Sequence, residues 1–156
     1  MSVSLWRIAV EARAYPANDL AGTGAKITGG RWNSPGVAML YCASTVSLAV
    51  LETVIHLQSG DLPFNRCVVR IDVPDDVWAS RLQLTPLPAG WDVIPHGISS
   101  CSAGDAWAAS LSSALLMVPS VIVPEEFNVL INPMHPDRAR ITATTIRRWS
   151  YDPRFS

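Results

Sequence analysis

Short apolar runs, separated by polar or glycine-rich stretches, predict the elements in the first part of the chain. Residues 5–10 carry enough apolar side chains for a strand, in which Arg7 is the one charged position. Residues 11–30 are mostly small and polar and end in GTGAKITGG. They predict a loop with room for a helical turn, whose glycines adopt positive φ or lie close to other parts of the chain. The compact run 37–41 predicts a buried strand.

A helix is predicted over residues 45–58, and a strand follows it over residues 66–73. Ser44 or Thr45 offers an N-cap for this helix, because a short polar side chain accepts a hydrogen bond from the free N–H groups of the first turn. Gly60 offers the stop.

The second half of the chain begins with an excursion over residues 74–100 that is rich in Pro, Asp, Gly and Ser. Its Trp and Leu side chains favour burial, so we expect short packed turns and not a linker. Ser102 and Asp105 resemble a capping box and predict a helix over residues 102–115. Pro119 then interrupts the pattern. Further strands are predicted over residues 120–123, 127–131 and 141–146.

These strands and helices interleave irregularly, without the steady strand–helix repeat of a doubly wound parallel sheet. The pattern therefore favours an α+β fold with a mixed or antiparallel sheet and flanking helices. A chain of 156 residues is long enough to bury a core without disulfides or metals, so we expect one domain over residues 1–156.

Composition and charge narrow the classes of function. The formal net charge is −1, and Arg147-Arg148 is the one cluster of basic residues, which argues against binding to nucleic acid. Cys42, Cys67 and Cys101 lie far apart among apolar or small residues, as buried reduced thiols do. With neither a signal-peptide pattern at the N-terminus nor a long apolar run, we expect a soluble cytoplasmic protein that does not contact membranes.

Several common catalytic motifs are missing from the sequence. GTGAKIT lacks the spacing of a phosphate loop, GxGxxG is incomplete, and there is no GxSxG elbow. The histidines and cysteines have no spacing typical of metal ligands, so we expect no metal site.

Residues 29–56 hold the most informative polar groups. Arg31 follows two glycines, Tyr41 ends an apolar run, and Glu52 lies on the predicted helix, so the three could line one cleft. Glu52 has mostly apolar neighbours one helical turn away, and a carboxylate there needs a partner. Two interpretations are open. Glu52 could be a boundary residue whose carboxylate reaches solvent or pairs with an arginine. It could instead be a carboxylate held in a cleft, where it stabilises positive charge on a substrate.

The other polar groups also allow two interpretations. Arg31 could grip a phosphate or carboxylate, or could be a surface arginine stacked on Trp32. Tyr41 is either a core residue with a satisfied hydroxyl or a platform for stacking. Arg7 needs an anionic partner, and Glu52 or a ligand phosphate would both serve. Together, guanidinium, aromatic ring and carboxylate suit cleavage of the N-glycosidic bond of a nucleotide such as NAD.

Five segments of the sequence resemble the RES domain, the toxin half of Xre–RES toxin–antitoxin pairs. These segments are LWRI, GGRWN, YCAS, the helix with LAVLE, and PSVIVPEEFNVLINPMHP. The last matches the long pattern PSxIVPxExNxLINPxHP, and the likeness covers nearly the whole chain. The family is named for an Arg, a Glu and a Ser, which correspond to Arg31, Glu52 and Ser120. Cys42-Ala43 departs from the shorter Tyr-x-Ser pattern that the resemblance implies.

The resemblance implies an ADP-ribosyltransferase-like α+β fold and a toxin that consumes NAD by hydrolysis, phosphorolysis or ADP-ribosyl transfer. NAD would be a substrate, with no cofactor. An Xre-type helix–turn–helix antitoxin would cover the cleft in a hetero-oligomer. The implied site is Arg31, Tyr41, Glu52 and Ser120, with Arg7 and the weaker Lys26 as further contacts to the dinucleotide.

The role of Ser120 and the function of the protein each have alternatives. Without a His/Asp partner spacing, Ser120 suits hydrogen bonding to the nicotinamide ribose or amide, or to Glu52, better than it suits nucleophilic attack. A ribonuclease-like toxin and a non-catalytic module that binds a partner are the alternative functions.

Overall fold

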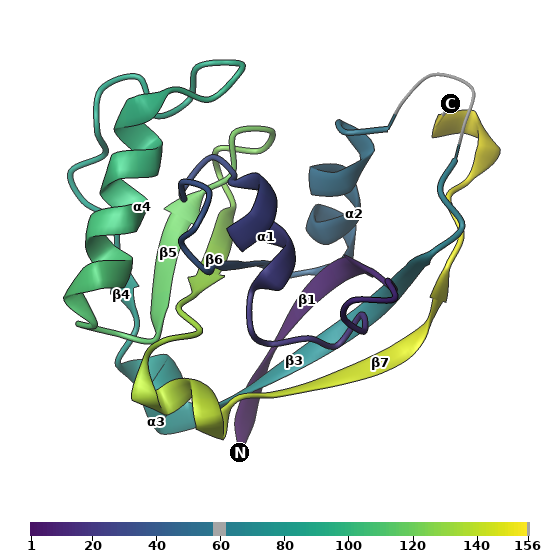
Figure 1. The fold of residues 1–156 in the computed structure, drawn as a ribbon, viewed down its shortest axis with the longest axis horizontal. Coiled ribbons are helices and arrows are strands. Elements are labelled where there is room, and N and C mark those ends of the chain that lie inside the picture. The colour runs from purple at the N-terminus through teal and green to yellow at the C-terminus, as the bar shows by residue number, and fades with distance from the viewer. Residues whose placement is uncertain (58–61, 156) are drawn as a thin grey trace.

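The computed structural model describes residues 1–57 and 62–155, which form one sheet with helices packed around it (Figure 1). The strands are β1 (Ser2–Val10), β2 (Leu40–Ala43), β3 (Arg66–Pro74), β4 (Leu82–Gln83), β5 (Leu115–Pro119), β6 (Phe127–Ile131) and β7 (Thr142–Trp149). The helices are α1 (Thr23–Thr28), α2 (Val46–Val54), α3 (Asp75–Ala79) and α4 (Ile98–Ser110), with 3-10 helices η1 (Pro136–Arg140) and η2 (Pro153–Phe155).

The sheet has the strand order β4-β5-β6-β2-β1-β3-β7. β4 and β5 are parallel, and every other neighbouring pair is antiparallel. This topology confirms the predicted α+β class with a mixed sheet.

The sheet divides into two halves at the junction of β1 and β2. β1 pairs with β3 along its whole length, whereas its register with β2 is the single pair Trp6 and Ala43. In Figure 1, β5 and β6 accordingly run in a different direction from β3 and β7. Helix α2 contacts both β1 and β2, so it spans the junction of the two halves.

The two faces of the sheet bury different sets of apolar residues, because side chains alternate along a strand. On one face, α2 packs on Ile8 and Ala43. Trp107 of α4 packs on Leu116 and Leu130 of the same face. The largest cluster of buried residues lies on the other face, where α3 packs through Val77. It includes Leu5, Ala9, Cys42, Ile71, Val77, Leu115, Val129 and Ile131.

The predicted start of α2 is confirmed. The Thr45 hydroxyl caps the helix by accepting a hydrogen bond from the Leu48 N–H, at 3.1 Å. The helix ends at Val54, earlier than predicted, and its predicted end at residues 58–60 lies outside the described residues.

The helix predicted over residues 102–115 is present with other bounds, and the strand predicted over residues 120–123 was wrong. α4 begins at Ile98 with Gly97 as its N-cap, and it ends at Ser110. The apolar run after it forms β5, not the end of a helix, and residues 120–123 form a turn. Periodicity cannot tell a helix from a strand in so short an apolar run. Here the run is a strand because it pairs with β6. The supposed capping residue Asp105 bonds instead to a distant loop.

Candidate functional site

Glu52, Ser120 and Asn128 form a hydrogen-bonded cluster between α2 and the sheet. The Ser120 hydroxyl donates to Glu52 Oε1 at 2.6 Å, and the Asn128 Nδ2 amide donates to the same oxygen at 2.8 Å. Glu52 is half-buried, and its partners come from the end of β5 and from β6. A carboxylate at the margin of an apolar face is stabilised by such charge-assisted hydrogen bonds. Glu52 therefore has the hydrogen-bond partners that a carboxylate at this place needs, and its action on a substrate stays a prediction.

The Ser120 hydroxyl has no capacity left for a substrate. Besides donating to Glu52, it accepts hydrogen bonds from the Ile122 and Val123 N–H groups, both at 3.1 Å, and the residue is fully buried. A hydroxyl offers one donor and two acceptor positions, and all are used. The geometry supports holding Glu52 as the role of Ser120, and it shows no partner that would make Ser120 a nucleophile among the described residues.

Arg31 lies in a tight turn, residues 30–34, that we call the arginine loop. The Tyr41 hydroxyl holds this loop from β2: it donates to Asn33 Oδ1 and accepts from the Trp32 N–H at 3.0 Å. Burial raises the pKa of Tyr41 well above its ordinary value, and the hydrogen bond from Trp32 opposes this only in part, so the phenol stays protonated. Tyr41 thus has the satisfied hydroxyl of a core residue.

Gly30 must be glycine because Tyr41 lies so close to it. A Cβ at Gly30 would lie 2.7 Å from the Tyr41 hydroxyl oxygen, and the preceding Gly29 has a φ of +72°. Both glycines thus behave as the sequence predicted. The Asn33 side chain completes the turn by donating to the carbonyls of Ala25 and Val37, both at 2.9 Å.

Helix α4 holds the opposite side of the arginine loop. The Asp105 carboxylate accepts hydrogen bonds from the Ser34 N–H at 2.9 Å and from the Ser34 hydroxyl at 2.6 Å. Next to Asp105, Gly104 brings the helix backbone against the carbonyl of Trp32, where a Cβ would lie only 1.7 Å from that oxygen. The loop is therefore fixed between β2 and α4.

Arg31 is an oriented cation without a carboxylate partner. Its Nη1 donates to the carbonyls of Trp91 and Val93 at 2.9 and 2.8 Å, and Trp32 stacks on Trp91 and not on the guanidinium. In the described part of the chain, Arg31 takes part in no ion pair. Because carbonyls are neutral, the guanidinium keeps its full charge and its remaining donors for an anion.

The two clusters lie on one face of the sheet. Tyr41 pairs with Leu130 and Ala43 pairs with Asn128 across β2 and β6, so Tyr41 and Asn128 are diagonal neighbours on the face that α2 and α4 cover. The structure therefore brings the arginine loop, Tyr41, Glu52 and Ser120 to a common face of the sheet. That they line one cleft stays a prediction.

Arg7 and Lys26 do not join this arrangement. Arg7 lies between Leu5 and Ala9 and opposite Cys42, on the other face of the sheet, and it forms no ion pair with Glu52. Its Nε is buried without a hydrogen-bond partner. Burial raises the pKa of Cys42 to about 12, against the opposing charge of Arg7. Lys26 is exposed on α1. Their contacts to a dinucleotide stay predictions.

Asn128 is the residue that the sequence interpretation missed. Its signals in the sequence are a polar amide in the apolar run FNVLI, where the alternation places it on the covered face of the sheet with Leu130, and its place as a fixed Asn in the pattern PSxIVPxExNxLINPxHP. Its partner Glu52 lies 76 residues away, so spacing along the chain gave no further clue.

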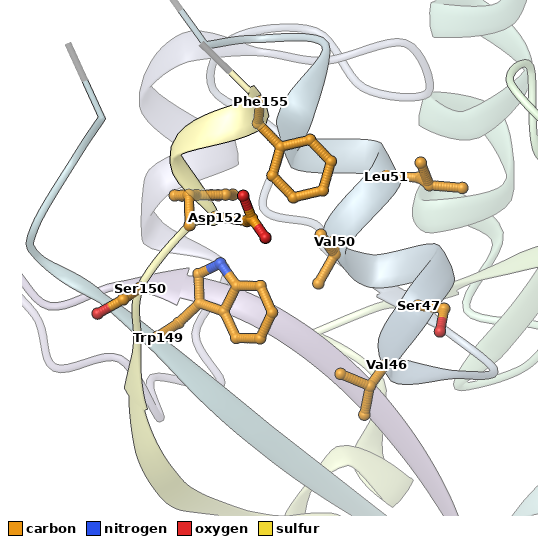
Figure 2. A pocket seen from close by; sticks show the side chains of 9 residues that line it. Val46, Ser47, Val50, Leu51, Trp149, Ser150, Asp152 and Phe155 are labelled. Carbon is orange, nitrogen blue, oxygen red and sulfur yellow. The ribbon is translucent and has the colours of Figure 1, made fainter.

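An apolar groove lies on another side of α2. This groove of about 650 Å³ is lined by Val46, Val50 and Leu51 of α2 and by the segment from Trp149 to Phe155. In Figure 2, the rings of Trp149 and Phe155 lie across the groove from Val50. No residue of the predicted site lines it, and Asp152 within it is paired with Arg154 at 2.7 Å.

Within residues 1–57 and 62–155, no group of three or more His, Cys, Asp or Glu side chains is arranged to hold a metal ion. No helix of this part of the chain has the length and apolar character to cross a membrane.

We expect Tyr41→Phe to destabilise the arginine loop. The change removes the donor to Asn33 and the acceptor of the Trp32 N–H, and leaving such buried groups unpaired costs about 1–3 kcal/mol. Thermal unfolding and the KM for the substrate are the measurements, and KM should rise because Arg31 loses its fixed position. Tyr15→Phe is the control, because the Tyr15 hydroxyl has no hydrogen-bond partner in the described chain. Equal melting temperatures for both variants would contradict this assignment.

The chain is similar to known proteins over nearly its whole length. It is 60% identical over 157 residues to "Prs ADP-ribosylating toxin" of Sphingobium sp. (strain YBL2), covering 99% of this chain and 98% of that protein. It is 36% identical over 152 residues to "Toxin Res" of Yersinia enterocolitica (serotype O:8 / biotype 1B), covering 97% and 98%.

A solved structure has a similar fold. The crystal structure of the M. tuberculosis MbcT–MbcA toxin–antitoxin complex matches with a TM-score of 0.62 at 20% identity, covering 94% of this chain and 85% of that one. At this identity the likeness concerns the fold. The model of the RES domain matches residues 4–153. With the arginine, the glutamate and the serine in place, and relatives that match along their whole length, the chain belongs to the RES domain family.

Proposed function

We propose that this protein is the toxin of a toxin–antitoxin pair and that it consumes NAD by cleaving the bond between nicotinamide and ribose. The observation that carries the proposal is a held carboxylate, Glu52, on the same sheet face as an oriented cation without a carboxylate partner, Arg31. A dinucleotide has a diphosphate for the cation and a ribose that becomes positive as nicotinamide leaves. The names of the relatives, toxins in each case and an ADP-ribosylating one in the first, support the same conclusion.

Each residue of the site has a separate task in this reaction. Arg31 binds the diphosphate through its remaining N–H groups, since Nη1 is used by the carbonyls of Trp91 and Val93. Glu52 accepts a hydrogen bond from a ribose hydroxyl and stabilises the oxocarbenium-like state electrostatically. Tyr41 holds the arginine loop, and its half-buried ring stacks on or flanks the nicotinamide.

The bond that breaks is the one between the ribose C1′ and the nicotinamide nitrogen, and its electron pair leaves with neutral nicotinamide. Water, phosphate or a side chain of a protein then supplies the electron pair for the new bond to C1′ and loses a proton. Among these, transfer to a protein is the outcome that the name of the Sphingobium relative supports.

The partner that we propose is an antitoxin of the Xre type, with a helix–turn–helix domain, that covers the site in a hetero-oligomer. The toxin–antitoxin complex among the structural matches supports an antitoxin partner. The reaction would take place in the cytoplasm, where a toxin encounters NAD.

Incubation of the purified protein, free of antitoxin, with NAD tests the activity. We expect release of nicotinamide, and we expect Arg31→Ala to raise the KM for NAD by about 10- to 100-fold, because a charge-assisted contact contributes about 1.5–3 kcal/mol. Chromatography of the products with and without phosphate identifies the acceptor.

Arg148→Ala is the matched control for Arg31→Ala. Arg148 also donates to a backbone carbonyl, that of Phe64 at 3.0 Å, but it is an exposed residue of β7. A KM unchanged by Arg31→Ala, or lowered activity in both variants alike, would contradict the role of Arg31. Absence of nicotinamide release and of ADP-ribosylated protein with the wild type would contradict the proposed function itself.

A further inference from the structure

The two hydrogen bonds to Glu52 converge on one of its two oxygens. Both the Ser120 hydroxyl and the Asn128 amide donate to Oε1, at 2.6 and 2.8 Å. Oε2 accepts no hydrogen bond from the described residues. Two donors on one oxygen fix the rotation of the carboxylate, and the other oxygen is the one presented to a ligand.

Asn128 is an unfavourable residue for its position if its role were only structural. Its Oδ1 is buried and has no hydrogen-bond partner among the described residues. Across the sheet it faces Ala43 on one side and Val118 on the other, both buried and apolar. Asparagine is also disfavoured in strands, whereas a β-branched apolar residue is favoured there. A valine would therefore suit this site better than asparagine does.

Asn132, just after the same strand, shows what a structural asparagine looks like in this fold. It is fully buried, its Nδ2 donates to the Ala108 carbonyl at 2.9 Å, and its Oδ1 accepts from the Met134 N–H at 3.0 Å. Both ends of its amide have partners, as buried amides generally do. Asn128 has a partner for its amide nitrogen alone, and that partner is the carboxylate of the site.

We propose that Asn128 is a positioning residue that, together with Ser120, holds Glu52 by Oε1 so that Oε2 acts on the ribose. This inference rests on the proposed function, because it assigns a task to the second oxygen of Glu52. The fold would tolerate an apolar residue at this place, and the reaction would not. Local features that lower stability without an evident structural gain are typical of functional sites.

Asn128→Val tests the inference by separating stability from turnover. The change removes the donor to Glu52 and also the unpartnered Oδ1, so we expect a melting temperature equal to or above that of the wild type. We expect kcat for nicotinamide release to fall by about 10- to 100-fold, because a misplaced catalytic group costs roughly this factor. The KM for NAD should change by less than about threefold, since the diphosphate contact of Arg31 is intact.

Asn128→Asp is a second variant with nearly the same shape. It replaces the donor by a carboxylate oxygen facing Glu52 Oε1, so repulsion turns Glu52 away, and we expect kcat to fall at least as far as in Asn128→Val. The matched control is Asn132→Ala, which loses two satisfied hydrogen bonds. It should melt several degrees lower, with kcat per folded molecule unchanged.

The wild type is assayed first, so that failure of the proposed function can be told from failure of the positioning role of Asn128. No nicotinamide release by the wild type overturns the proposed function and this inference with it. An active wild type with full kcat in Asn128→Val overturns the positioning role alone. The positioning role is also overturned if the melting temperature of Asn128→Val falls as far as that of Asn132→Ala, because Asn128 would then have a structural role.

Discussion

Glu52→Gln is expected to lower nicotinamide release by at least about 100-fold while leaving the fold intact, because electrostatic stabilisation of a transition state is commonly worth that much. Glutamine can keep an oxygen toward the Ser120 hydroxyl and the Asn128 amide, so the observed hydrogen bonds at 2.6 and 2.8 Å persist. Its amino group then replaces Oε2. The ribose meets a neutral donor where the wild type has an anionic acceptor.

The measurement is the rate of nicotinamide release at saturating NAD, together with thermal unfolding. Glu52→Ala is the informative comparison. Alanine leaves the Ser120 hydroxyl and the Asn128 amide without an acceptor, so it should also cost about 1–3 kcal/mol of stability. Glu125→Gln is the control, because Glu125 is exposed near the same turn. Full activity in Glu52→Gln, or equal losses in Glu52→Gln and Glu125→Gln, would contradict the mechanism.

Gly104→Ala is expected to destabilise the protein by about 3 kcal/mol, at the upper end of the usual cost of overpacking. A Cβ at this position would lie 1.7 Å from the Trp32 carbonyl oxygen and 2.6 Å from its carbon. Both are backbone atoms, so no side chain can rotate out of the way. Either α4 or the arginine loop must move, and with the loop Arg31 moves as well.

The sign of this effect is diagnostic, because glycine to alanine in the interior of a helix ordinarily stabilises by about 1 kcal/mol. Thermal unfolding should show a decrease of about 6 to 12 °C for a chain of this size. The folded fraction should also have a raised KM for NAD. Ser102→Ala, at an exposed position of the same helix, is the control and should melt at or slightly above the wild-type temperature. An increase in the melting temperature of Gly104→Ala would show that the two backbones can separate freely.

Features that depend on neighbours along the chain could be predicted from the sequence. The Thr45 cap is one, since its hydroxyl meets a backbone N–H three residues on. The alternation in β3 and β6 is another, because one side of each strand must be buried. The α+β class follows from such local patterns and their order.

Features that depend on contacts between distant segments could not be derived in this way. Ser120 meets Glu52 across 68 residues, and only the resemblance to a family pointed to that serine. Asp105 resembles a helix cap, yet its hydrogen bonds go to Ser34, 71 residues away. The apolar residues of β5 fit a helix equally well until β6 pairs with them. In each case a tertiary contact outweighs the local preference.

The arginine loop has a consequence for the thermodynamics of ligand recognition. Its backbone and the Arg31 side chain are already ordered by Tyr41, by Asp105 and by the carbonyls of Trp91 and Val93. Freezing one long side chain on association ordinarily costs about 0.5–1.5 kcal/mol of conformational entropy. Here that loss occurs during folding, so an anion that binds Arg31 meets a preformed surface. If the proposed substrate and the proposed antitoxin both bind there, they compete by the complementarity of their shapes and charges to this surface.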